Sequence, residues 1–199
     1  KIVGLNGHAV IQGYDGRIND WRDILAETRK TPGVTHAAPL IEQPLLATAE
    51  GRVEAILARG MQVNNILKNE ALDGKVLVGN LKELVPGSGN VAIGSRLAQN
   101  LGVQLGDSVT IINPQGRSTP FGTVPREISY QIAAIFEVGV YDYDKAFVIM
   151  PIEDAQLLLL MGDEIQMIEV KTENADKVSE ILAPLLPKIS NRAVIRDWK

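Results

Sequence analysis

The order of local structure is clearest in residues 90–109, which read NVAIGSRLAQNLGVQLGDSV. The run NVAIG predicts a strand that passes directly into a helix at Ser95–Leu101. Gly102 ends that helix, because glycine adopts the left-handed conformation of a helix C-terminus without steric cost. The turn LGD that follows predicts a second strand from Ser108. This strand–helix–turn–strand order indicates an α+β fold.

The next segment, residues 113–126, reads NPQGRSTPFGTVPR and separates strand-like runs at 108–112 and 128–135. Its three prolines fix φ and remove amide donors, so we expect this loop not to continue a sheet ladder. Loops of this length in compact domains are usually functional or disordered. The central Pro-Phe-Gly would present Phe121 on a stiffened backbone. Two interpretations stay open, a surface that another protein grips and a floppy hairpin tip.

Both ends of the chain carry a strand–helix–strand pattern. Near the N-terminus, residues 8–12 and 34–40 predict strands around a helix that Asn19 can cap. The apolar face of that helix is formed by Trp21, Ile24, Leu25 and Thr28. Near the C-terminus, residues 167–171 and 193–195 flank a second helix. These units are the ingredients of a split βαβ layer.

We therefore expect one subdomain made from both termini, residues 1–75 and 164–199, with residues 76–163 inserted into it. Within the first of these segments, Glu-Gly at the centre of residues 43–61 predicts a hairpin turn. Because the chain begins with Lys1 rather than Met, we expect it to be a piece of a longer protein.

Composition excludes several classes of function. The 199 residues are 45% apolar, which is ordinary for a globular protein and too high for disorder. The net charge of −4 and the lack of a basic stripe argue against a nucleic-acid partner. The absence of cysteine excludes disulfides, zinc–thiolate sites and cysteine catalysis. The sequence has no apolar run of about 18 residues that could span a bilayer.

No set of residues predicts catalysis. His8 and His36 are the only histidines, and neither has a Ser or Asp at a motif spacing. Residues 141–145 alternate Tyr and Asp before Lys, which predicts a solvated turn rather than a calcium loop. Nothing assembles a nucleophile, a base and an oxyanion hole. We expect no enzyme, no metal and no cofactor.

The run IGSRLAQNLGVQLGDSV, residues 93–109, resembles the signature of the extracytoplasmic core domain in the MacB and LolC/LolE class of ABC transporter permeases. The opening Gly4–His8 and the closing Arg196–Trp198 also resemble LolC/LolE chains. In that family the matching segment is a periplasmic domain of an inner-membrane protein, between its first and second membrane spans. The resemblance implies a MacB-like core, with a porter-like subdomain from the termini and a sabre-like insertion.

Residues 119–122, with Pro114 and Pro125 flanking, are similar to the projecting β-hairpin hook that LolC-type subunits carry and LolE-type subunits lack. The resemblance implies that the hook recruits the chaperone LolA, which takes outer-membrane lipoproteins from the inner membrane. It also implies a sister permease subunit (LolE-type or a second copy), a separate ATPase subunit LolD and lipoprotein cargo. The predicted chaperone-binding residues are Pro114, Arg117, Thr119, Pro120, Phe121, Gly122, Pro125 and Arg126.

The sequence departs from the family hook in two ways. Phe121 stands where the family usually has Met, although both side chains are large and apolar. The family also has a pad of basic and amide residues beside the hook, which this chain does not reproduce. The matching positions are Thr110, Glu127 and Ile128. Arg117 or Arg126 could take the place of the pad. The alternative function is a stator or signalling domain of a MacB-like or FtsX-like permease that binds no chaperone.

Overall fold

The computed structural model describes residues 7–197. Gly4, Leu5, Asn6 and Trp198, which carry part of the family resemblance, lie outside the described residues. Within residues 7–197 no helix is both long enough and apolar enough to cross a membrane.

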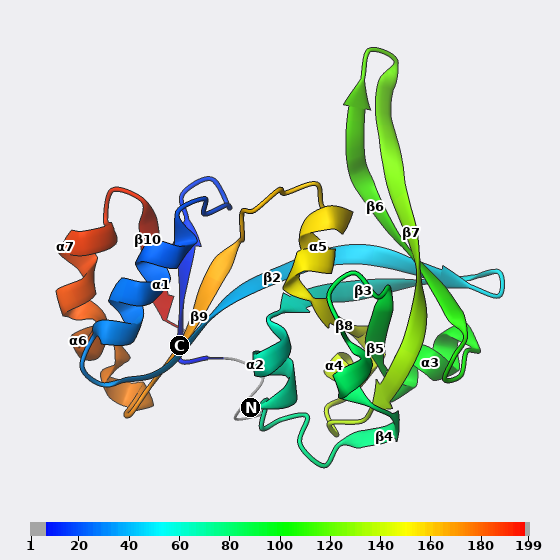
Figure 1. Cartoon of the computed structure of the whole chain (residues 1–199), viewed down its shortest axis with the longest axis horizontal. Coiled ribbons are helices and arrows are strands. Elements are labelled where there is room, and N and C mark those ends of the chain that lie inside the picture. The colour runs from blue at the N-terminus through cyan, green and yellow to red at the C-terminus, as the bar shows by residue number, and fades with distance from the viewer. Residues whose placement is uncertain (1–6, 198–199) are drawn as a thin grey trace. The chain divides into compact units, whose positions relative to one another are not determined.

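The chain forms two compact units (Figure 1), a terminal unit of residues 1–41 and 163–199 and an inserted unit of residues 42–162. Residues 42–75, which were expected with the termini, lie in the inserted unit in this division. Whether the porter and sabre subdomains follow this division stays a prediction.

The terminal unit is a four-stranded antiparallel sheet with helices, in the strand order β10–β1–β9–β2. Its elements are β1 (Ala9–Gly13), α1 (Trp21–Lys30), the first half of β2 (Val34–Ala49), β9 (Met167–Thr172), α6 (Val178–Leu182), α7 (Leu186–Ile189) and β10 (Ala193–Asp197). Three-residue 3₁₀ turns at Ala175–Lys177 and Ala183–Leu185 flank α6. β9 lies between β1 and β2, and β1 lies between β9 and β10, so each terminal βαβ unit is split by a strand of the other. A split βαβ layer was predicted from the sequence, and its strand order was not.

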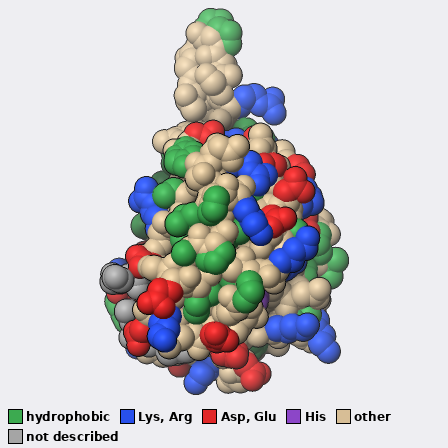
Figure 2. All heavy atoms as spheres, turned by 90° about the vertical axis from the view of Figure 1, so that its left-hand side faces the viewer, with side chains coloured by type: hydrophobic (Ala, Val, Ile, Leu, Met, Phe, Trp, Pro, Cys, Tyr) green, Lys and Arg blue, Asp and Glu red, His purple; other side chains and the backbone are tan. Residues whose placement is uncertain are grey.

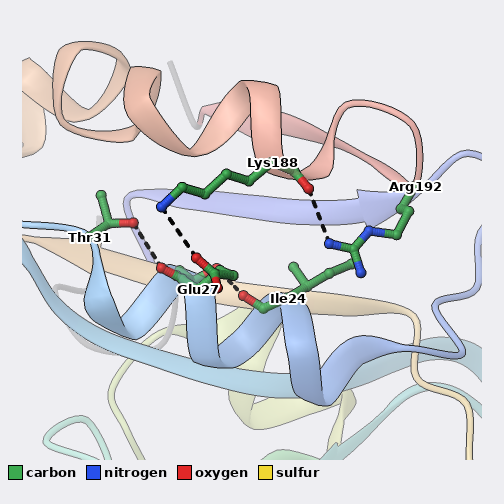
Figure 3. Close-up of polar contacts among 6 residues, drawn as sticks. Ile24, Glu27, Thr31, Lys188 and Arg192 are labelled. Atoms are coloured by element: carbon green, nitrogen blue, oxygen red, sulfur yellow. Dashed lines mark hydrogen bonds and ion pairs between the residues drawn. The ribbon is translucent and has the colours of Figure 1, made fainter.

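Helix α1 buries the predicted face, Trp21, Ile24, Leu25 and Thr28. The predicted cap was wrong, because the helix begins after Asp20, whose side chain makes no capping hydrogen bond. The polar side of α1 is tied to the α7 region (Figure 3). There Lys188 lies 3.3 Å from the Glu27 carboxylate, and Arg192 donates to the Lys188 carbonyl at 3.1 Å.

The inserted unit holds the remaining strands. Its elements are the second half of β2, β3 (Arg52–Met61), α2 (Val63–Leu67), β4 (Val76–Gly79), a 3₁₀ turn (Leu81–Glu83), β5 (Asn90–Gly94), α3 (Ser95–Leu101), β6 (Ser108–Thr119), β7 (Gly122–Phe136), α4 (Tyr141–Ala146), β8 (Phe147–Pro151) and α5 (Ile152–Leu158). The pairings run β2–β3–β8–β5–β7–β6, and β6 returns to β2, which closes the sheet on itself. Closure removes free sheet edges. Among the described strands of the inserted unit, β4 alone lies outside this closed circuit, and it pairs with β7.

The predicted solvated turn at 141–145 was wrong, because these residues begin helix α4. Asp144 is buried there, and its carboxylate accepts the amides of Val138 at 2.8 Å and Gly139 at 3.0 Å. The carboxylate therefore replaces water with two backbone donors, which is how an acidic side chain tolerates burial.

Candidate functional site

The segment predicted to leave the sheet ladder is the outer part of the β6–β7 hairpin (Figure 1). The two strands stay paired up to the turn at 119–122, with a register shift between residues 113 and 117. The expectation that the prolines stop the ladder was therefore wrong. Pro114 and Pro125 lie in the irregular stretch, so neither removes a donor that regular pairing would use. We call residues 113–126 the hook.

Gly116 lets the two hook strands approach closely at this irregularity. A Cβ atom at Gly116 would lie 2.4 Å from the Val124 carbonyl oxygen and 2.5 Å from the Arg126 amide nitrogen. Both neighbours are backbone atoms, which cannot move aside as a flexible side chain does. The hook path therefore requires glycine at this position.

The tip of the hook is the turn Thr119–Gly122. The Thr119 hydroxyl donates to the Gly122 carbonyl at 2.7 Å and accepts the Phe121 amide at 3.3 Å. Pro120 occupies the second turn position, where its fixed φ is favoured. Gly122 has a φ of 118°, a conformation that favours glycine. Phe121 is 100% exposed, so the turn holds a large apolar ring in solvent.

The root of the hook is packed, in contrast to its tip. Asn113 is buried, and its side-chain amide donates to the Leu158 carbonyl at the end of α5 at 3.4 Å. Its side-chain oxygen accepts the Gln115 amide at 3.1 Å. Ile111 lies two residues before Asn113, on the same face of β6. It pairs with Ile128 of β7 and is completely buried. The root is therefore fixed on the inserted unit while the tip stands free.

A hollow of ≈ 410 Å³ lies beside the hook. Arg117, Val124 and Arg126 line it from the hook, Glu127 from the next position of β7, and Leu160 from the turn that follows α5. Leu160 is 40% exposed and has a φ of 54°, a strained conformation for a branched side chain. The Arg126 Nε is buried and has no hydrogen-bond partner within residues 7–197.

The positions that match the family pad do not form one here. The Thr110 hydroxyl pairs with the Ser129 hydroxyl at 2.8 Å, and Ile128 pairs with Ile111 in the ladder. Glu127 lines the hollow together with Arg117 and Arg126. The basic side chains that line the hollow are Arg117 and Arg126, the two predicted substitutes for the pad.

Two buried titratable groups that the sequence did not single out are Asp154 in α5 and Tyr130 in β7. Burial raises the pKa of Asp154 in α5, and the Gly87 amide, which donates to it at 2.8 Å, opposes that rise. Burial also raises the pKa of Tyr130, and the nearby Asp154 carboxylate adds to the increase. The Tyr130 hydroxyl and the Asp154 Oδ2 have no hydrogen-bond partner within the described residues. No local sequence signal marks this pair, because burial, the largest cause of both shifts in pKa, depends on packing between distant segments.

The two histidines that the sequence singled out both lie in the terminal unit. His8 Nδ1 accepts the Thr172 amide at 3.0 Å in the terminal unit. Burial lowers the pKa of His36, and the charges of Lys171 and Arg29 lower it further. No group of three His, Cys, Asp or Glu side chains within residues 7–197 could hold a metal ion.

Comparison with known families and proteins finds similarity to periplasmic domains and to transmembrane proteins of ABC-type transport systems. The model of the MacB-like periplasmic core domain matches residues 4–186. Two relatives are called lipoprotein-releasing system transmembrane protein LolC. The one from Neisseria meningitidis serogroup B is 29% identical over 199 residues, and the one from Xylella fastidiosa is 30% identical over 198 residues. Both matches include 100% of this chain and 48% of the relative, so the chain spans about half the length of these curated relatives.

A solved structure has the same fold. The extracellular domain of the noncanonic ABC-type transporter YknZ from Gram-positive bacteria superimposes with a TM-score of 0.63 at 11% identity. The match covers 98% of this chain and 100% of that domain. At this identity the likeness shows the fold alone.

Proposed function

The chain belongs to the family of MacB-like periplasmic core domains, and on that premise we propose that it is the periplasmic domain of a lipoprotein-releasing permease whose hook recruits the chaperone LolA. The LolC relatives, which match it over its whole length, support this choice within the family. The proposed result of recruitment is that lipoproteins leave the inner membrane for the chaperone without crossing water.

The observation that carries the proposal is the exposure of Phe121. The Phe121 side chain is 100% exposed, so its burial contributes no free energy to the folding of its own domain. It is held by Pro120 and by the two hydrogen bonds of Thr119. Such a group fits an apolar cavity in a partner, and a chaperone that carries lipid chains must have one.

The energetics of such a contact are favourable. Burying a side chain of this size contributes about 1.5–3 kcal/mol. A turn that is already ordered loses little conformational entropy on binding, so more of this free energy appears as affinity. Arg117 and Arg126 add positive charge beside the apolar tip, which would speed the encounter with an acidic partner surface.

The rest of the transport machinery lies outside this chain. We assign ATP hydrolysis to a cytoplasmic subunit, LolD, and a sister permease subunit to the same complex. The role of this domain is to place the chaperone where cargo leaves the membrane. Its own residues perform no reaction in this scheme.

Pull-down of purified LolA by the domain tests the proposal. Phe121→Asp should abolish recovery of the chaperone, because the hook would carry a charge into an apolar cavity. The matched control is Val53→Asp, which places the same charge at a position that is 59% exposed in β3. Equal recovery by wild type and Phe121→Asp would reject the role of the hook.

The alternative of a stator or signalling domain makes the opposite prediction. Deletion of residues 115–124 should then leave chaperone recovery unchanged, while changes at an interface with the sister subunit should abolish export. The exposed Phe121 ring favours recruitment over this alternative, because a stator function does not require an apolar side chain at the tip of the hook.

A further inference from the structure

Strand β10 forms the outer edge of the sheet in the terminal unit. Among the described strands it pairs with β1 alone, with Gly13 opposite Ala193 and Ala9 opposite Asp197. A strand at a sheet edge presents backbone N–H and C=O groups that can pair with another chain. β10 contains no proline, which would remove one of these donors. The edge can therefore accept a further strand.

An apolar pocket of ≈ 170 Å³ lies beside this edge strand. Ile195 and Asp197 line it from β10, so it lies on the face to which alternate residues of the strand point. The other lining residues are Ala9, Val178, Ser179, Leu182 and Leu186. The Ser179 hydroxyl donates to the Asp197 carboxylate at 3.2 Å. The polar groups of the pocket thus contact each other, and the rest of its lining is aliphatic.

The pocket lies where the helical segment beside β10 is broken. Pro184 and Pro187 lack the amide donor of a continuous helix, and the 3₁₀ turn Ala183–Leu185 separates α6 from α7. Leu182 ends α6 and Leu186 begins α7, where it is 46% exposed. Figure 2 shows hydrophobic side chains gathered in the middle of this side of the molecule, with charged groups around them. Apolar surface is therefore exposed next to an open strand edge.

The sequence of β10 is compatible with antiparallel pairing to a second copy of itself. In a two-fold arrangement centred on Ile195, all five residues of Ala193–Asp197 lie opposite a residue of the other strand. Arg196 then faces Val194 of the second copy, and Asp197 faces Ala193. No two like charges are directly opposed, which is the condition that a stable cross-strand pairing requires.

The two neighbouring registers are less favourable. An axis at Val194 would place Arg192 opposite Arg196 of the second copy. An axis at Arg196 would place this residue opposite its own counterpart. Like charges that face each other across a strand pair are destabilising, and both shifts also shorten the overlap. Charge and length therefore select the register centred on Ile195.

This register also gives the pocket an occupant. The Cβ atoms of directly opposed residues lie about 4.5–5.5 Å apart on the same face of a sheet. Ile195 is half-buried and lines the pocket, so its counterpart from the second copy reaches the mouth of the same pocket beside Leu186. By symmetry each copy supplies an aliphatic side chain to the other.

We propose that the chain forms a symmetric dimer in which two β10 strands pair antiparallel about Ile195. The Ile195 side chain of each copy seats at the apolar pocket of the other, against Leu182 and Leu186. The sheets of the two terminal units then become one continuous sheet. This interface uses no residue of the inserted unit.

Single-cysteine cross-linking tests the register, because the chain has no cysteine of its own. Ile195→Cys should cross-link two copies under mild oxidation, since opposed Cα atoms about 4.5–5.5 Å apart suit a disulfide. Val194→Cys and Arg196→Cys should each fail alone, because their own counterparts lie about 8 Å away. An equimolar mixture of these two variants should cross-link. Cross-linking of either variant alone, or of none of the three, would overturn the proposal.

Charge exchange tests the interface in solution. Wild type should sediment as a dimer at high micromolar concentration, and a monomer there would overturn the proposal. Val194→Arg should weaken dimerisation about tenfold, because it places two arginines opposite Arg196 and its counterpart. Adding Arg196→Glu to this variant should restore dimerisation to within about threefold of wild type, whereas Arg196→Glu alone should change it little. A folded double variant, checked by circular dichroism, that stays as weak as Val194→Arg would refute the pairing.

Discussion

The inserted unit contains two long hairpins whose tips differ in turn type, in polarity and in their contacts with the rest of the unit. The β2–β3 hairpin turns at Glu50 and Gly51, whose φ angles are 52° and 75°, the signs of a type I′ turn. The β6–β7 hairpin turns at Pro120 and Phe121. The tip of the β2–β3 hairpin is polar, and the backbone twist of its turn matches the right-handed twist of the flanking strands. The second carries proline and an exposed aromatic ring.

The two tips also differ in what surrounds them. Arg52, just after the β2–β3 turn, donates to the Asn100 carbonyl of α3 at 3.3 Å, so that tip is tied to its own unit. At the hook tip, the two hydrogen bonds of Thr119 stay within the turn, and the Phe121 side chain is fully exposed. A hairpin that merely connects strands is polar and anchored, whereas the hook is apolar and free. This contrast supports the proposed role of the hook in binding a partner.

Exchange of the turn chemistry should produce the largest effect. Replacement of Pro120–Phe121 by Asn-Gly gives the hook the kind of turn that the other hairpin has. Binding of LolA should fall by at least about tenfold, because the lost ring burial is worth about 1.5–3 kcal/mol. The free energy of unfolding should change by less than about 0.5 kcal/mol, since the tip is exposed. Calorimetric titration and urea unfolding measure the two quantities.

The matched control is Glu50→Asn, which makes Asn-Gly at the other turn. It should leave LolA affinity unchanged and preserve or slightly increase stability. If the two turn variants bind LolA equally, the contrast between the hairpins has no functional meaning.

Gly116→Ala should have the next largest effect. The added Cβ would meet the Val124 oxygen at 2.4 Å and the Arg126 nitrogen at 2.5 Å, so the two strands must separate. We expect a loss of about 1–3 kcal/mol in unfolding free energy, together with weaker LolA binding. Ser118→Ala, in the exposed part of the same strand, is the control for urea unfolding. A stable Gly116→Ala variant with normal binding would show that the hook path is adjustable.

The packed root of the hook should respond to pH. Because the pKa of Asp154 is raised by burial, its ionised form is disfavoured in the folded state. Its contribution to stability is therefore present at low pH and is lost as pH rises through the folded-state pKa. At pH 7, Asp154→Asn should raise the unfolding free energy by about 1 kcal/mol. Thermal unfolding across pH 4–8 should show this difference vanish towards acid. A difference that is independent of pH would contradict the assignment.

The sequence predicts the features that depend on local rules. Periodicity identifies the buried face of α1, and Glu-Gly identifies the β2–β3 turn, because each signal lies within a few residues. The split βαβ layer and the MacB-like fold are likewise confirmed. Phe121 is recognisable as a candidate from its neighbours Pro120 and Gly122, and its role in binding stays a prediction.

The features that were missed depend on contacts between distant segments. Proline predicts a break in strand pairing. Pro114 and Pro125 lie where a register shift already interrupts the pairing of β6 with β7. The sequence of one strand does not show such a shift, because it depends on how the two strands align. Asp144 was missed for a different reason: its carboxylate accepts the amides of Val138 and Gly139, only six and five residues earlier, and the alternation of Tyr and Asp gives no sign of these bonds. Leu160 joins Arg126 in the hollow from a different element. Sequence reasoning therefore names the tip of the hook but not the surface at its base.

A pair of threonines offers the finest comparison of the two hairpins. The Thr48 hydroxyl donates to the Arg52 carbonyl at 2.8 Å across one turn, and the Thr119 hydroxyl donates to the Gly122 carbonyl at 2.7 Å across the other. Replacement of either residue by Ala removes one exposed hydrogen bond and should cost about 0.5–1 kcal/mol of unfolding free energy. Similar losses in urea unfolding would show that the two bonds are physically equivalent.

Only Thr119→Ala should then weaken LolA binding, by a few-fold, because the freed turn must be ordered again when Phe121 inserts. Thr48→Ala should bind as wild type. If both variants bind normally, the turn is held by Pro120 alone. If both weaken binding, the two hairpins belong to one binding surface and the distinction between connector and hook fails.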